Sequence, residues 1–221
     1  MDNSGRSFDE IGELVRTISG QVDVAISLKQ LCQRLNQDER IESVYDHTFE
    51  GRGFALIRSS TDYAFALALT RLNEGQKNSA NLQGFFKAYA NNREVIKERI
   101  LARRMKYVED QQARLETDGH LEQLDNAANA HKDLLGSHQW SRTKSLRDKF
   151  IAHNALDRDK VQLPKYGYLY ELCDRTASIV SEISAALLGE GTNFSKQNEI
   201  WNDYAEKFLE SMIAWRQIAG D

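Results

Sequence analysis

Residues 146–159, LRDKFIAHNALDRD, place Arg147 six positions before His153, with the apolar run FIA between them. The apolar run ties both polar ends to a segment that we expect to be buried. The same kind of arginine-histidine spacing occurs twice elsewhere in the chain, so the spacing alone decides nothing. The segments around it must therefore carry the interpretation.

An ideal α-helix would not align these two side chains. Six residues rotate by about 600°, which leaves Arg147 and His153 roughly 120° apart around the helix. They can act together only if the helix ends, bulges, or lets the long arginine reach around it. We therefore expect the motif to lie where a helix ends or distorts.

The rest of the chain favours an all-α fold. Its 221 residues contain one proline and long stretches of Ala, Leu, Glu, Lys, Arg and Gln, and no long segment alternates apolar and polar residues. Ser7 and Glu10 have the spacing of a capping box at the start of a first helix. A second long helix is expected at about residues 49–73.

Further helix boundaries follow from capping residues and glycines. Ser79 is the expected N-cap of a short helix, and residues 92–119, dense in helix formers, are expected to form one long charged helix that Gly119 closes. Gly136 should break the next helix, and Gly189 should end the helix that follows the motif.

Charge and cysteine content suggest a cytoplasmic protein without a membrane partner. The net charge of −4 does not favour nucleic-acid binding by the whole surface. Residues 93–106 hold six basic and two acidic side chains, for which a solvated helix face is the simpler interpretation. Cys32 and Cys173 lack a nearby cysteine partner and are expected to be reduced, as in the cytosol. The N-terminal residues lack the pattern of an export signal.

No motif predicts a cofactor or a metal. His131 and His138 lie seven residues apart, without nearby Cys, Asp or Glu at ligand spacing. There is no phosphate-binding loop, no GxGxxG and no serine-histidine elbow. We expect neither a metal ion nor a cofactor.

The order of several segments resembles a known family. LRDKFIAHNAL is preceded by LALTRLNEG and KNSANLQGFF and is followed by PKYGYLYELCDRTASIVSEIS. This arrangement resembles the HEPN superfamily, and specifically the HEPN domain of abortive-infection phage-resistance proteins of the U type. The resemblance suggests a HEPN-like domain at residues 45–190, with an N-terminal helical arm at 1–44 and a C-terminal helix packed on the bundle at 191–221.

The resemblance implies a HEPN-like bundle of long antiparallel helices that forms a homodimer and joins two copies of the motif in one cleft. Catalytic members are metal-independent endoribonucleases that act in phage defence or as toxins. Arg147 would stabilise the phosphate as charge develops, and His153 would be the general acid or base. Asp148 would orient one of them, although Asn is commoner at this position in the family. Ala155 stands where some members carry a tyrosine whose modification silences them.

The expected partners are RNA, a second copy of the chain and an antitoxin protein. Lys144, Lys149 and Asn154 are the residues that we expect to contact RNA beside the catalytic group.

Two alternatives stay open. One is a non-catalytic HEPN module that binds RNA, nucleotide or a partner protein through Arg147. The other is a helical oligomerisation protein, in which Arg147 pairs with Asp148 or another carboxylate and His153 is an ordinary helix-end residue.

Overall fold

The computed structural model describes residues 7–45, 48–75, 79–148 and 164–219, and within these ranges all regular structure is helical. The expected all-α fold is confirmed. The helices are α1 (Phe8–Gln37), α2 (Glu39–Tyr45), α3 (Phe49–Asn73), α4 (Leu82–Asn91), α5 (Arg93–Arg104), α6 (Asp110–Leu135), α7 (His138–Leu146), α8 (Tyr166–Leu188) and α9 (Phe194–Ala219). No helix in the described ranges combines the length and the apolar character needed to cross a bilayer.

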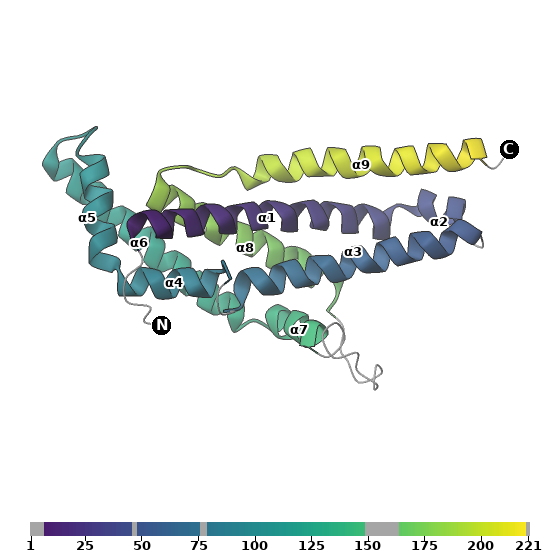
Figure 1. Ribbon diagram of the computed structural model, residues 1–221, viewed down its shortest axis with the longest axis horizontal. Helices are drawn as coiled ribbons and strands as arrows, with labels where there is room; N and C mark the ends of the chain where they lie inside the picture. The colour runs from purple at the N-terminus through teal and green to yellow at the C-terminus, as the bar shows by residue number, and fades with distance from the viewer. Residues whose placement is uncertain (1–6, 46–47, 76–78, 149–163, 220–221) are drawn as a thin grey trace.

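Helix α1 lies at the centre of the bundle and packs against α3, α8 and α9. Figure 1 shows α9 along one long edge of the molecule, with α1 beside it and α7 at the opposite edge. Helices α5 and α6 form a hairpin that projects at one end. The short helix α7 rests on α3, α6 and α8.

The main hydrophobic core joins α1 to the helices that follow it. Ile11, Ile18 and Ile26 of α1 are almost completely buried, in the same cluster as Phe65 of α3 and Val180 of α8. Helix α1 therefore contributes directly to the central core. The division of the chain at residues 44 and 190 stays a prediction.

The helix starts and stops follow local chemistry at several predicted positions. The capping box at Ser7 is confirmed, because its hydroxyl accepts from the Glu10 N–H while the Glu10 carboxylate accepts from the Ser7 N–H at 2.6 Å. Gly136 ends α6. Gly189 ends α8 in the left-handed conformation at φ 71°. The short helix α4 begins later than expected, because Asn81, and not Ser79, accepts from the Gly84 N–H.

The single helix expected over residues 92–119 is wrong. The chain turns back after α5, and α6 then runs straight through Gly119, whose missing side chain faces open space. Both halves are rich in helix formers, so helix propensity does not locate the turn. Its position is set by tertiary contacts, since α5 buries Ile96 and Ile100 and packs along α6.

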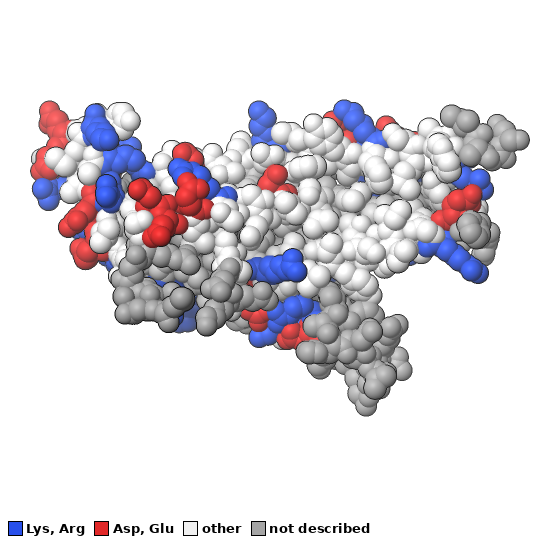
Figure 2. Space-filling model, in the orientation of Figure 1, with Lys and Arg blue, Asp and Glu red and all other residues white. Residues whose placement is uncertain are grey.

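Half of the basic side chains at residues 93–106 pair with acids of α6. Ion pairs join Arg93 to Asp125 at 2.5 Å and Lys97 to Asp118 at 3.1 Å, and a further pair joins Arg104 to Glu116. Figure 2 shows the resulting mixture of positive and negative side chains at this end of the molecule. A solvated helix face was expected for this run, and three of its six basic side chains have acidic partners on α6.

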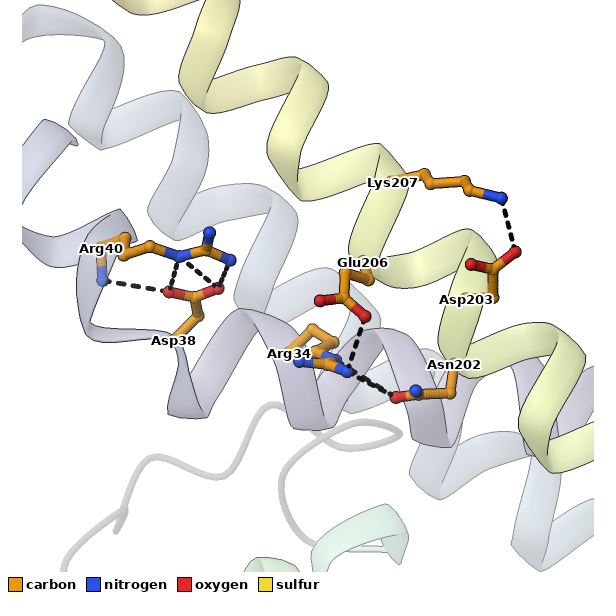
Figure 3. Close-up of polar contacts among 7 residues, drawn as sticks. All are labelled: Arg34, Asp38, Arg40, Asn202, Asp203, Glu206 and Lys207. Atoms are coloured by element: carbon orange, nitrogen blue, oxygen red, sulfur yellow. Dashed lines mark hydrogen bonds and ion pairs between the residues drawn. The ribbon is translucent and has the colours of Figure 1, made fainter.

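Polar side chains fix α9 along α1. The Arg34 guanidinium donates to Asn202 Oδ1 at 3.0 Å and pairs with Glu206 at 3.2 Å, as Figure 3 shows. One turn earlier on each helix, Gln30 donates to Asn198 at 3.0 Å. These contacts fix which face of α9 meets the bundle and which faces remain outside.

His131 of α6 is a buried titratable group in this bundle. Its side chain stacks on Phe86, with ring centroids 5.3 Å apart, and the residue is 4% exposed. Burial lowers the pKa of His131 to about 4, and a hydrogen bond to the Asn73 backbone opposes this shift only in part. The imidazole is therefore neutral in the folded protein at neutral pH.

The first prediction concerns acid stability. The unfolded chain binds a proton at His131 near pH 6.5, whereas the folded protein binds it only near pH 4. The free energy of unfolding should fall between these values by up to about 3 kcal/mol because of this group. Chemical denaturation across this range should show a smaller loss for His131→Gln than for the wild type. Equal slopes for both proteins would contradict the assignment.

Candidate functional site

Helix α7 carries the candidate arginine to its own C-terminal end. The Ser137 hydroxyl caps its start by accepting from the Trp140 N–H at 3.2 Å, and Trp140, Thr143 and Leu146 form the buried face. Arg147 follows the last helical residue, and the backbone there widens into a π turn. The expectation that the arginine lies where a helix ends or distorts is confirmed for Arg147. Such turns are frequent at functional sites.

Glu74, immediately after α3, joins this end of α7 to the bundle. Its carboxylate forms an ion pair with Arg147 Nη1 through one oxygen and with Lys144 Nζ through the other, the latter at 3.2 Å. Lys144 and Arg147 are three residues apart, so they lie on one side of α7. A single carboxylate therefore holds both cations.

Asp148 fixes the other edge of the guanidinium. Its Oδ1 accepts from Arg147 Nε at 2.6 Å and lies 2.5 Å from Arg147 Nη2. The Arg147 side chain is 16% exposed, while that of Asp148 is 43% exposed. Arg147 is thus clamped between two carboxylates in a largely buried position. The role predicted for Asp148, to orient the arginine or the histidine, stays a prediction.

The clamp leaves part of the arginine available. A guanidinium has five N–H donors, and the contacts to Glu74 and Asp148 use three of them. Within the described ranges, the other two N–H groups have no acceptor. The four side chains carry two positive and two negative charges, so the cluster as a whole is neutral. A phosphate arriving here meets a fixed donor fork and not a strong positive field.

The position of Glu74 is itself fixed by its neighbours. Buried Asn73 donates to Thr176 Oγ1 of α8 at 3.1 Å, and the Gly75 N–H donates to Gln83 Oε1 of α4 at 2.7 Å. The end of α3 is thereby tied to two other helices. This support is what allows one carboxylate to hold the end of α7 in place.

Three of the six residues predicted for the site lie outside the described residues. These are His153, the expected general acid or base, and Lys149 and Asn154, two expected RNA contacts. Arg147, Asp148 and Lys144 are described and lie together in one cluster. We expected no metal site at His131 and His138. In the described ranges no three His, Cys, Asp or Glu side chains are grouped so as to hold a metal ion.

The sequence interpretation missed Glu74. The residue ends the segment LALTRLNEG, which was quoted for the family resemblance, and a carboxylate just past a helix end gave the only signal. Its pairing with Arg147 spans 73 positions of sequence. A contact of that separation follows from the packing of α7 on α3 and not from local pattern.

Comparison with known proteins identifies the family of the chain. The family model HEPN_AbiU2, described as AbiU2, matches residues 8–208 and so includes α1, the Glu74 clamp and most of α9. No curated protein and no solved structure matches the chain. The match covers nearly the whole sequence, and the chain belongs to the AbiU2 family of HEPN proteins.

Proposed function

We propose that the protein is a metal-independent endoribonuclease that acts in phage defence or as a toxin. Membership of the AbiU2 family suggests a HEPN-type function in abortive infection. The observation that carries the proposal beyond the family is the clamped arginine. Arg147 is permanently charged, partly buried and fixed by two carboxylates, and two of its N–H donors have no acceptor among the residues that the structure describes.

The proposed reaction needs only groups of the protein and of the RNA. The ribose 2′-oxygen attacks the adjacent phosphorus, and the bond to the 5′-oxygen breaks. The products are a 2′,3′-cyclic phosphate and a free 5′-hydroxyl. His153 supplies acid-base chemistry by removing the 2′-OH proton or by protonating the leaving oxygen. Arg147 stabilises the negative charge on the non-bridging oxygens as it develops.

Two copies of the chain would complete the site. One imidazole cannot be base and acid in the same step, whereas two facing copies provide both. The position of α7 at an outer edge of the bundle is compatible with such a contact (Figure 1). Lys144, 47% exposed beside Arg147, would contact the RNA backbone, together with Lys149 and Asn154.

A second candidate function rests on the neutrality of the cluster. Glu74 and Asp148 already balance the charges of Lys144 and Arg147, which suits a binding or structural role as well as catalysis. A non-catalytic HEPN module would bind RNA, nucleotide or a partner protein without cleaving it. Its binding to RNA would weaken with salt.

The second prediction tests catalysis at Arg147. Arg147→Ala should lower the rate of RNA cleavage by about a hundredfold or more, because transition-state charge loses its donor fork. Arg147→Lys should stay strongly impaired, since an ammonium lacks the planar fork. Cleavage of a labelled RNA in the presence of EDTA measures both effects.

The matched control is Arg142→Ala on the same helix. Arg142 donates to His138 at 3.1 Å and has no recorded contact with Glu74. This variant should cleave RNA at nearly the wild-type rate. Salt-sensitive RNA binding without cleavage by the wild type would instead support the non-catalytic module.

The third prediction concerns Glu74 as a positioning residue. Glu74→Gln keeps the shape of the side chain but removes the negative charge that holds Arg147 and Lys144. RNA should bind more tightly, because the cluster gains net positive charge, while single-turnover cleavage should slow by about tenfold because Arg147 is held less firmly. Parallel binding and single-turnover assays separate the two effects. A loss of both binding and cleavage in proportion to unfolded protein would show a merely structural role.

A further inference from the structure

A row of large apolar side chains on α9 remains uncovered. Ile200, Tyr204, Phe208 and Trp215 are 38%, 57%, 46% and 61% exposed. Their spacing of four, four and seven residues places them on one face of the helix. We call these four residues the α9 stripe.

The α9 stripe continues into a groove between α9 and the start of α3. The groove has a volume of about 500 Å³ and is bordered almost wholly by apolar atoms. Ile57 of α3, 42% exposed, forms part of its other wall. Residues from both helices line it: Gly53, Phe54, Ile57, Phe208, Met212 and Trp215.

We propose that a second copy of this chain covers the α9 stripe, with the two α9 helices antiparallel across a two-fold axis. A two-fold contact requires a surface that is complementary to itself. Ile200 and Trp215 lie equally far from the midpoint between Lys207 and Phe208. Antiparallel pairing about that point sets Ile200 of each copy against Trp215 of the other and places the two Phe208 side chains next to each other.

The same midpoint also relates Tyr204 of the stripe to Ser211, which lies on the same face of α9. Tyr204 and Ser211 are equally far from it, so each tyrosine meets the small serine of the other copy. A large side chain opposite a small one allows two helices to approach closely. The row therefore has the alternation of sizes that self-pairing needs.

Charges along one edge of the stripe fit the same register. Lys207 pairs with Asp203 at 2.7 Å on the outer side of α9, away from the contacts of Arg34 (Figure 3). Glu210 lies on the same edge, less than one turn further along. Antiparallel pairing brings Lys207 of each copy within one turn of Glu210 of the other. The two Lys207 side chains also lie near the axis, where each is paired with Asp203 of its own helix.

The exposed apolar area of the stripe is large enough for an interaction site. Each aromatic side chain can bury roughly 150–250 Å², so three half-exposed rings with Ile200 and Ile57 offer on the order of 500 Å² per copy. A patch of this size on a monomer commonly marks an interaction site. A specific interface needs roughly 800 Å² per partner, and the polar edges of α9 can supply the remainder.

This contact is separate from the proposed ribonuclease site, because α9 and α7 lie on opposite edges of the bundle (Figure 1). Pairing through α9 leaves the α7 edge free for a second contact. Two independent two-fold contacts on one chain can close into a tetramer. Assembly through α9 can therefore be tested independently of RNA cleavage.

The fourth prediction measures assembly mass by light scattering at tens of micromolar protein. Phe208→Glu and, independently, Tyr204→Glu should each halve the mass of the wild-type assembly, because a charge then lies in the paired stripe. Tyr107→Glu is the matched control, since Tyr107 is 77% exposed between α5 and α6, far from α9. It should leave the mass unchanged. Circular dichroism checks that the variants keep their helices.

A charge exchange tests the register. Lys207→Glu should weaken the assembly, and adding Glu210→Lys should restore it, because the opposite charges then meet again across the axis. A monomeric wild type, or a mass that neither stripe variant lowers, would overturn the proposal. Failure of the double variant to restore the assembly would overturn the antiparallel register.

Discussion

The ion pair between Glu74 and Arg147 joins the end of α3 to the end of α7, and the geometry of the candidate site depends on it. Arg147 is otherwise a long side chain at a helix terminus, with many rotamers open to it. Two carboxylates reduce that freedom, and the entropy of ordering the arginine is lost during folding and not when a substrate binds. The same contacts limit the long-range attraction of RNA, because a cluster without net charge attracts it only weakly from a distance. In the proposed function, such a site would favour precise contact with one phosphate over strong binding along a strand.

The support for this pair extends into the core. Asn73 links the end of α3 to α8, and the buried neutral His131 packs beneath the same helix end through its contact with the Asn73 backbone. The polar groups of this region are thus fixed before any substrate arrives. Away from the site, three cations of α5 are already paired with acids of α6, which lowers the net charge of the longest basic run. The α9 stripe lies on the other edge, where apolar area and not charge is available.

Much of the fold could be predicted from local chemistry, and the remainder depended on distant contacts. The Ser7 capping box, the glycine stops at Gly136 and Gly189 and the all-α class follow from short-range rules. The turn between α5 and α6 does not, because helix formers occupy both sides and only packing decides where the chain reverses. Arg147 was found through the order of segments around it, while Glu74 was missed because its partner is 73 residues away.

We propose that the protein cleaves RNA without a metal ion, by attack of a ribose 2′-oxygen. The most direct measurement compares two oligonucleotides of one sequence in EDTA, all-RNA and the same RNA with a single 2′-deoxy residue at the cleaved position. The account predicts cleavage of the first only, leaving a 2′,3′-cyclic phosphate and a 5′-hydroxyl. Equal cleavage of both oligonucleotides, or of neither by correctly folded wild-type protein, would contradict it.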